Sequence, residues 1–420
     1  MHFSIKIVST GKVFPPSEQL GETWRDALEK AHRNTYGLCL CLSDDQERPV
    51  CIRRKGKNLH LARFPDTSHL HHKKCQFYAT SSEQSGRRGY SRDAIKNLEN
   101  GGLRIKLARG LMPPKEAVGG NPQALPRDRA PGERRSTMSL GGLLDLLWTE
   151  AELNTWRGDQ PSKRWDLKVG NALLRQAERF HVGHRTLDEA LLLPAKEDER
   201  EHKRNQSVVN NAYHSGLRLV AIGPLARFNS IRDEDLPQLR LGAPFGVPRL
   251  VLDELTRDAL RYSYANELGA WKRGEKVYAI VQMALQAKDP KSRTDTAHVL
   301  DVSLRRLSTR FIPLDSSYEG ELEQKLVDEG RSFTKPLKFD HDDAVFPDFW
   351  MLDMGCDYPV EVFGMSTPEY LQRKDAKFEI YANLEKYPKG WWFWDVLKQK
   401  EIPPLPTLEF DTPISFADLS

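Results

Sequence analysis

The N-terminal part of the chain carries its apolar residues in short, alternating or β-branched runs, which are typical of strands. Two such runs are "FSIKIVS" (3–9) and "VCIRRKGKNLHLARF" (50–64). From Met138 to about Lys203 the apolar spacing becomes helical, as in "SLGGLLDLLWTEAEL" and "VGNALLRQAERF". That segment ends in the charge run "AKEDEREHKRNQ", which we interpret as an exposed helix or loop.

From Gly216 the pattern returns to strands. "LRLVAIGPLARF", "KVYAIVQMALQ" and "HVLDVSLRRLSTRF" are short, β-branched and alternating. Between the first two lies "LDELTRDALRYSYANELGAW", whose spacing predicts a helix. The middle of the chain is therefore predicted to be α+β.

The last part of the chain predicts a helix over 319–329, strands over about 346–353 and 359–363, a helix over 368–384 and a strand over 390–394. This α-β-β-α-β order implies a mixed sheet with helices packed on it. The segment 112–137 carries too many prolines and glycines for a regular element, so we interpret it as a linker.

These patterns together predict an α+β multidomain protein. Its N-terminal module is expected to be small and β-rich, and its C-terminal domain to be a mixed sheet. The expected divisions are a first module (1–85), a basic segment and linker (86–137), a helical domain (138–212), an α+β domain (213–312) and a mixed-sheet domain (313–411).

The composition supports a folded, water-soluble chain. The sequence has 420 residues, of which 39% are hydrophobic and 9% aromatic, enough to bury several cores. The N-terminus lacks the pattern of a secretory signal, and no run of about eighteen apolar residues is present. The five cysteines are too few and too clustered for a disulfide scaffold. We therefore expect a cytoplasmic protein without a membrane segment.

The net charge of +4 says little about partners, but its distribution says more. Residues 52–135 are rich in Lys and Arg, as in "IRRKGK", "HHKK", "SGRRGYSR" and "RDRAPGERR". A basic stretch of this kind indicates phosphate contacts, and a solvated surface or linker explains it equally well.

A cysteine–histidine cluster in the first module has the composition of a zinc site. "YGLCLCLSDD" supplies Cys39 and Cys41, and "DTSHLHHKKCQFY" supplies Cys75 with three neighbouring histidines. Zinc prefers four such ligands in a tetrahedron, brought together as two pairs by tight turns. The residues alone leave His69, His71 and His72 open as the fourth ligand. Cys51 is a further thiol, but its apolar β run favours a place in the core.

Carboxylates in the C-terminal part have the composition of a hard-cation site. Asp348 follows Pro347 in one predicted strand, and Glu361 lies in the next, in "PVEVFG". If these strands are neighbours, both carboxylates can face the same side and hold Mg²⁺ or Mn²⁺, which phosphodiester hydrolysis uses to activate water. Glu319, at the start of the preceding helix, offers a third acid.

A lysine two residues after the Glu would lie on the same face of the strand, but Phe363 takes that place. The following helix offers a replacement. Tyr370, Lys374, Lys377 and Tyr381 are spaced as one stripe of a helix, so Lys377 can reach the carboxylates. Arg373 and Lys374, about a turn nearer the helix start, are candidate phosphate ligands.

This constellation resembles the PD-(D/E)XK nuclease superfamily, in the form where the lysine has migrated to the helix after the Glu strand. The run "PDF…VEVFGM…EY…K…Y" is also similar to nuclease domains attached to some helicases. The resemblance covers about residues 316–395. It implies that the domain over 313–411 is nuclease-like, with a mixed sheet of the restriction-endonuclease type. It implies metal binding and catalysis by Glu319, Asp348, Glu361 and Lys377.

The chain as a whole resembles domain-of-unknown-function family 1173. The similarity runs through "CLCL", "HLARFPDTSHLHHKKC", "GYSRDAIKN", "LSTRFIPLDSSYE", "FPDFWMLD" and "PVEVFGM". In the family's zinc-like motif the His four before the last Cys corresponds to His71, which gives the set Cys39, Cys41, His71 and Cys75. The resemblance implies a bacterial setting of conjugative plasmids and integrative elements, and no established activity.

Two functions remain open at this point. The first is a Mg²⁺- or Mn²⁺-dependent nuclease acting on nucleic acid, with DNA favoured, whose zinc-containing basic module docks the substrate. The second is a catalytically inactive nucleic-acid-binding or scaffold protein that uses the nuclease fold as a platform. The nuclease is favoured because the sequence has all four groups that the chemistry needs: Glu319, Asp348, Glu361 and Lys377.

Overall fold

The computed structural model describes residues 2–32, 34–55, 58–63, 67, 70–72, 75–77, 94–98, 102–113, 136–158, 163–288, 291–292, 294–337 and 346–407. Most of the expected linker, the basic run at 85–92 and His69 lie outside these residues. Among the described helices, none is long and apolar enough to cross a membrane.

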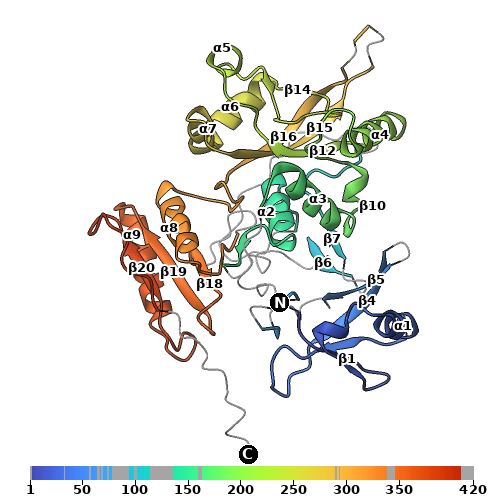
Figure 1. Ribbon diagram of the computed structural model, residues 1–420. Coiled ribbons are helices and arrows are strands. Elements are labelled where there is room, and N and C mark those ends of the chain that lie inside the picture. Colours follow the sequence, from blue (N-terminus) through green and yellow to red (C-terminus); the bar gives the residue numbers. More distant parts are fainter. Residues whose placement is uncertain are drawn as a thin grey trace, which may run out of the picture. The chain divides into compact units, whose positions relative to one another are not determined.

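The chain divides into two compact units, each built from several segments. The larger unit contains Met1–Leu153, Lys163–Pro313 and Leu337–Ala344. The smaller unit contains Asn154–Ser162, Leu314–Pro336 and Val345–Ser420. Helices and mixed sheets occur along the chain, so the predicted α+β class is confirmed (Figure 1).

The N-terminal strands form an antiparallel sheet in the order β2-β1-β3-β4-β5. The predicted run 50–64 is a hairpin in which Ile52 pairs with Leu61. Helix α1 (Glu22–Ala31), which was not predicted, buries Trp24, Leu28 and Ala31 along one stripe. The strands are β1 (Ile5–Ile7), β2 (Val13–Phe14), β3 (Gly37–Cys39), β4 (Pro49–Lys55) and β5 (Asn58–Arg63).

The predicted helices after Met138 are present as α2 (Leu140–Glu150) and α3 (Asp166–Ala177). Helix α2 is apolar almost all round and lies inside the core of the larger unit. The charge run beginning at Ala195 leads into a further helix, α4 (Arg200–Ser215), which ends at Gly216 in the left-handed conformation. Nearby short strands form a sheet in the order β10-β9-β7-β6, with bounds β6 (Ile95–Asn97), β7 (Leu103–Ile105), β9 (Phe180–Val182) and β10 (Arg185–Thr186).

The middle of the chain builds a six-stranded mixed sheet in the order β11-β12-β15-β16-β14-β13 (Figure 1). Its three long central strands are those that the apolar alternation predicted. The helix predicted over 252–271 is two helices, because the backbone at Tyr264 leaves the helical conformation between them. The elements are β11 (Leu191–Leu192), β12 (Leu219–Pro224), α5 (Ser230–Asp233), β13 (Gln238–Leu239), β14 (Arg249–Val251), α6 (Glu254–Ser263), α7 (Ala265–Lys272), β15 (Val277–Leu285) and β16 (Thr296–Arg306).

The described residues of the smaller unit form one sheet, in the order β20-β19-β18-β17-β8. Strand β19 pairs antiparallel with β18 and parallel with β20, and α9 makes the crossover between the two parallel strands. The predicted helices and strands are present, and β17 and β8 are two further strands that were not predicted. The elements are β8 (Thr155–Trp156), α8 (Ser317–Asp328), β17 (Phe333–Thr334), β18 (Phe349–Met351), β19 (Tyr358–Phe363), α9 (Pro368–Tyr381) and β20 (Trp392–Asp395).

The two helices of the smaller unit cover opposite faces of its sheet. Phe363 of β19 stacks on Phe378 of α9, with ring centroids 5.8 Å apart. Trp394 of β20 points to the other face and meets Tyr318 of α8 at 5.8 Å. Because side chains alternate along a strand, Glu361 lies on the same face as Phe363, under α9.

Candidate functional site

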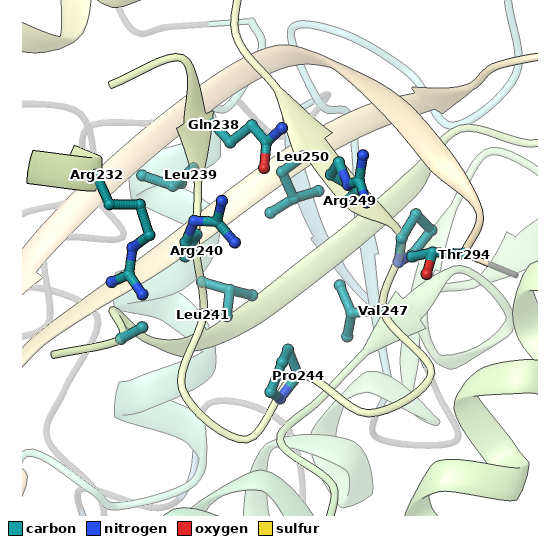
Figure 2. Close-up of a pocket in the computed structure, with 12 residues that line it drawn as sticks. Arg232, Gln238, Leu239, Arg240, Leu241, Pro244, Val247, Arg249, Leu250 and Thr294 are labelled. Atoms are coloured by element: carbon teal, nitrogen blue, oxygen red, sulfur yellow. The ribbon is translucent and has the colours of Figure 1, made fainter. Parts of the chain in front are cut away.

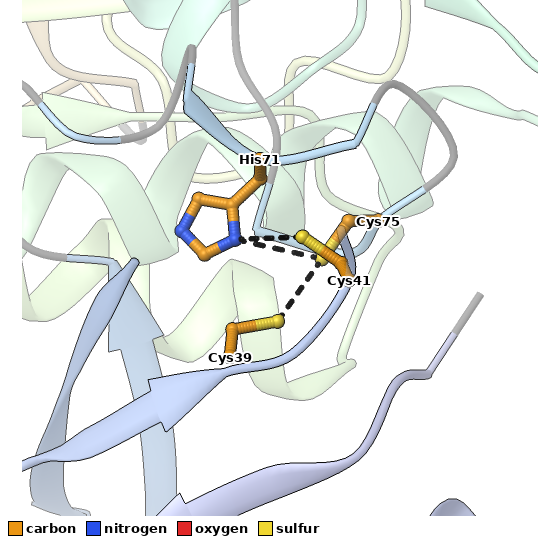
Figure 3. A group of neighbouring side chains, drawn as sticks. All are labelled: Cys39, Cys41, His71 and Cys75. Carbon is orange, nitrogen blue, oxygen red and sulfur yellow. Dashed lines mark hydrogen bonds between the residues drawn. The ribbon is translucent and has the colours of Figure 1, made fainter. Parts of the chain in front are cut away.

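Four side chains in the N-terminal module converge on one point, as Figure 3 shows. The ligand atoms of Cys39, Cys41, His71 and Cys75 all lie within 4.8 Å of one another, and all four side chains are buried. The sulfurs of Cys39 and Cys75 are 3.6 Å apart, and Nδ1 of His71 is 3.5 Å from the Cys41 sulfur. Among the described residues this is the one group of three or more such ligands.

These separations fit a tetrahedral zinc site. With Zn–S bonds of about 2.3 Å and Zn–N bonds of about 2.05 Å, tetrahedral angles place two sulfurs about 3.8 Å apart and a sulfur about 3.6 Å from a nitrogen. The Cys75 sulfur lies 3.7 Å from Nδ1 of His71, in agreement with the second value. The predicted grouping is therefore confirmed, and these residues can hold a structural metal ion such as zinc.

Backbone amides support the cluster in the way that thiolate ligands require. The backbone N–H of His72 donates to the Cys41 sulfur at 3.2 Å, and that of Phe77 donates to the Cys75 sulfur at 3.4 Å. Hydrogen bonds from the Cys39 and Cys75 thiols lower the pKa of Cys41 well below its usual range. His71, rather than His72, supplies the histidine nitrogen of the group.

Arg48 holds the two halves of the cluster together. Its side chain is only 2% exposed, and its Nε donates to the carbonyl of Leu70, next to His71, at 2.6 Å. Its Nη1 donates to the carbonyl of Gln46 at 2.7 Å, in the loop that follows the two cysteines. Sequence reasoning missed this residue, because a single arginine in a polar loop carries no distinguishing pattern.

In the smaller unit, Asp348 and Glu361 lie across the β18–β19 ladder. Phe349 pairs with Val360, so the next position in this register sets Asp348 opposite Glu361. Directly opposed residues of an antiparallel pair share one face and have Cβ atoms about 5 Å apart. Oδ2 of Asp348 accepts a hydrogen bond of 2.7 Å from the backbone N–H of Val362, which fixes the carboxylate beside the strand.

Glu361 is 1% exposed, and α9 supplies partners for both of its oxygens. Lys377 donates to Oε2 at 2.6 Å, and the hydroxyl of Tyr381 donates to Oε1 at 2.9 Å. Lys377 also donates to the carbonyl of Phe346, two residues before Asp348, at 3.1 Å. The helix lysine that the sequence predicted as a replacement therefore does reach the Glu of the strand.

Glu319 opens α8, where its side chain is 5% exposed and meets a lysine that sequence reasoning missed. Lys335 donates to Oε2 of Glu319 at 2.7 Å and lies 3.0 Å from Oδ2 of Asp315. Lys335 follows the two-residue strand β17 and is itself 3% exposed. A buried lysine directly after so short a strand could be found only from the folded structure.

Glu361 and Glu319 hold their protons more tightly than free carboxyls, because the pKa of each is raised. Burial raises the pKa of Glu361 to about 8, and the charge of Asp348 adds to the effect. Burial also raises the pKa of Glu319 to about 8, with further contributions from Asp315 and Asp348 that oppose the effect of Lys335. The charge of Asp348 thus contributes to the raised pKa of both glutamates.

The two candidate phosphate ligands differ in position. Lys374 is engaged within the unit: Nζ lies 2.6 Å from Oδ2 of Asp395 and 4.8 Å from the centre of the Phe363 ring. Arg373, its neighbour on α9, is exposed. Phe363, in the place where the strand lysine is absent, packs with the aromatic side chains of α9 and β20.

The acidic network differs from the cysteine cluster in how closely its ligand atoms approach. Asp348, Glu361 and Glu319 do not form a group as tight as that of the cysteines and His71. Mg²⁺ in proteins is usually bound by one or two carboxylates together with waters and substrate phosphates, so Asp348 and Glu361 are the residues that could hold it here.

The chain belongs to the family described as "Protein of unknown function (DUF1173)", whose model matches residues 16–396. No curated protein and no solved structure matches it.

Proposed function

We propose that the protein is a metal-dependent nuclease whose smaller unit hydrolyses phosphodiester bonds of nucleic acid, with DNA as the favoured substrate. The observation that carries this proposal is the position of Asp348 opposite Glu361, with Lys377 of α9 bound to Glu361 at 2.6 Å. Two carboxylates and an amine at one end of a strand pair are the groups that this chemistry needs.

In this proposal Asp348 and Glu361 hold Mg²⁺ or Mn²⁺, and Glu319 acts from the neighbouring helix. The cation supplies a water of lowered pKa and offsets charge on the scissile phosphate. The ammonium of Lys377, which donates to Oε2 of Glu361 in this structure, would donate to the attacking water and orient it. Arg373, exposed on the same helix, contacts the phosphate backbone, and Lys374 fixes the helix through Asp395.

The migrated lysine has a physical reason in the fold. Glu361 and Phe363 share the face that α9 covers, since side chains of a strand alternate. Phe363 fills the space beside α9 with an aromatic ring, and the helix returns a lysine over Glu361 sixteen residues later. The strand position can then be apolar without loss of the amine.

The N-terminal module has a separate role in this proposal. Zinc held by Cys39, Cys41, His71 and Cys75 would stabilise the module. The Lys- and Arg-rich stretch within residues 52–135 would provide contacts to phosphates. In keeping with the family resemblance, we propose that the substrate is DNA of a bacterial mobile element.

One observation favours the second function, a catalytically inactive nucleic-acid-binding platform. Both oxygens of Glu361 are already hydrogen-bonded, to Lys377 and to Tyr381. A cation must displace at least one of these partners. If Mn²⁺ does not displace Lys377 or Tyr381 from Glu361, the smaller unit binds nucleic acid without cleaving it.

Cleavage of plasmid and single-stranded DNA in Mn²⁺ separates the two functions. We expect cleavage by the wild type and a loss of at least about 100-fold in Asp348→Asn and Glu361→Gln, since each removes a metal ligand. Glu321→Gln is the matched control, because Glu321 lies on α8 near Glu319 but is exposed. Wild-type DNA binding without cleavage supports the platform instead, and equal cleavage by all variants removes the proposed site.

A further inference from the structure

A pocket of about 380 Å³ opens in the larger unit at the hairpin of β13 and β14 (Figure 2). Its size falls within the range of about 300–1,000 Å³ that small-molecule sites occupy. Most of its lining is apolar, and the leucines of the two paired strands, Leu239 and Leu250, are each 2% exposed. Such a floor accepts the flat or apolar body of a small molecule.

The loop that forms the pocket is held in place by backbone hydrogen bonds. Gly242 N–H donates to the carbonyl of Pro224 at 2.7 Å, and Ala226 N–H donates to the carbonyl of Arg240 at 2.9 Å. At the tip, the buried Asn205 side chain donates to the carbonyl of Phe245 at 3.0 Å. The pocket is therefore largely preformed, which lowers the entropic cost of binding.

The charged groups that line the pocket are all arginines. Arg232, Arg240 and Arg249 lie around it, together with the carboxamide of Gln238, and the described lining residues include no acidic residue. Figure 2 shows Gln238 and Arg240 on one arm of the hairpin and Arg249 on the other. The two arms thus present cations on both sides of the apolar floor.

These arginines differ in how far their charge is compensated. Arg232 is paired, since its Nε and Nη2 donate to the two oxygens of Asp233 at 2.8 and 2.7 Å. The nearest acidic oxygen to Arg240 is 3.9 Å away, also on Asp233. Among the described residues, the exposed guanidinium of Arg249 has no ion-pair partner. Two guanidiniums are thus available to a ligand.

We propose that this pocket binds a small organic phosphate, a phosphomonoester on a flat or apolar body of about mononucleotide size. Arg240 and Arg249 bind the phosphate from the two arms, the leucine floor carries the body, and Gln238 donates or accepts a hydrogen bond at its polar edge. A guanidinium fork matches phosphate oxygens in pairs. A phosphomonoester carries about −1.5 to −2 charges near pH 7, which matches the unpaired Arg249 and the loosely paired Arg240 better than a monocarboxylate does. The inference is independent of the nuclease proposal.

Calorimetric titration of the full chain with adenosine 5′-monophosphate tests this assignment. We expect saturable binding with one nucleotide per chain. Adenosine lacks the phosphate, inorganic phosphate lacks the organic body, and benzoate lacks the second charge. The affinity for each of these three compounds should therefore be at least about 10-fold lower. Arg240→Gln and Arg249→Gln should each weaken the nucleotide by about 10-fold or more. Arg200→Gln, at the exposed start of α4, is the matched control and should bind as the wild type does.

Val247→Trp adds a second test, because it fills the pocket without removing a charge. This variant should lose nucleotide binding while its thermal unfolding stays close to that of the wild type. The proposal is overturned if the wild type does not bind the nucleotide at millimolar concentration. It is also overturned if inorganic phosphate or benzoate binds as tightly as the nucleotide. The same holds if Arg240→Gln and Arg249→Gln bind the nucleotide as tightly as the control Arg200→Gln.

Discussion

Nζ of Lys377 lies 2.6 Å from Oε2 of Glu361, although the two residues are 16 positions apart on a helix and a strand. The parallel pairing of β19 with β20 requires a crossover, and α9 makes that crossover on the face where Glu361 points. The contact between Lys377 and Glu361 is thus a consequence of the sheet topology. It also places the candidate amine where a strand lysine would otherwise stand.

The first prediction concerns this amine. Lys377→Gln should reduce Mn²⁺-dependent cleavage by about 100-fold or more, because the water loses a charged group that orients it. Lys377→Arg, which keeps the charge but changes the geometry, should keep more activity than Lys377→Gln. Rates measured at saturating Mn²⁺ check this, with exposed Lys400→Gln as control. Equal rates for Lys377→Gln and the control would remove Lys377 from the site.

The second prediction is a pH dependence of stability. The pKa of Glu361 is about 8 in the folded chain, against an ordinary value of 4.5. Between these values the folded state keeps the proton and the unfolded state releases it, so stability falls as the pH rises from about 4.5 to 8. Glu361→Gln removes this contribution.

Thermal unfolding without divalent cations checks the pH prediction. Relative to the variant, the wild type should lose Tm between pH 5 and pH 8, and the two should be most alike at pH 5. The same comparison with Glu321→Gln, whose side chain is exposed, should show parallel curves. Parallel curves for Glu361→Gln would mean that the carboxyl titrates normally.

The third prediction concerns the buried lysine. Burial lowers the pKa of Lys335, but the charges of Asp315, Glu319 and Asp348 raise it by more, so the ammonium stays charged. Lys335→Met removes the cation that lowers the pKa of the buried Glu319, so this carboxyl stays protonated and loses its hydrogen-bonding partner, which should cost about 1–3 kcal/mol near neutral pH. The double change Lys335→Met with Glu319→Gln should recover part of that loss above pH 8, where Glu319 would otherwise have to take up a proton in order to stay buried.

Urea unfolding of the wild type, Lys335→Met, Glu319→Gln and the double variant measures this coupling. Lys325→Met on α8 is the control, because its pair with Glu329 is partly exposed and should contribute less than about 1 kcal/mol. Additive effects of the two substitutions would show that Lys335 and Glu319 stabilise the unit independently.

The fourth prediction concerns zinc. The purified chain should contain one zinc ion, and Cys75→Ser should lose it and lower the thermal stability of the N-terminal module, because structural zinc contributes on the order of 10 kcal/mol to small modules. Cys356→Ser, a thiol outside the cluster, should keep both the zinc and the stability. Metal analysis and unfolding with and without a chelator decide the point. Equal zinc in the two variants would contradict the assignment.

Much of the fold followed from periodicity where elements are long or strongly patterned. The alternation in "KVYAIVQMALQ" predicted β15, and the helical stripe after Pro368 predicted α9. Strand β17, with only two residues, is too short to carry a period. It pairs with β8, where Phe333 lies opposite Trp156 from a distant part of the chain. A pairing over such a distance leaves no local pattern to read.

The same contrast holds for the candidate sites. The cysteines could be recognised as metal ligands from their residue type and spacing, and the structure brings Cys39, Cys41 and Cys75 together with His71. The resemblance selected His71 where the residues alone left three histidines open. Lys335 and Arg48 were missed because only the tertiary fold creates the contacts that single them out, such as those with Glu319 and with the carbonyl of Leu70.

Titration of the zinc-loaded chain with Mn²⁺, followed by electron paramagnetic resonance, shows whether Asp348 and Glu361 hold a cation. We expect one Mn²⁺ bound per wild-type chain, binding weakened by about 10-fold or more in Asp348→Asn and in Glu361→Gln, and unchanged binding in Glu321→Gln. Mn²⁺ binding of the same affinity in all four proteins, or no binding by the wild type, would contradict this expectation.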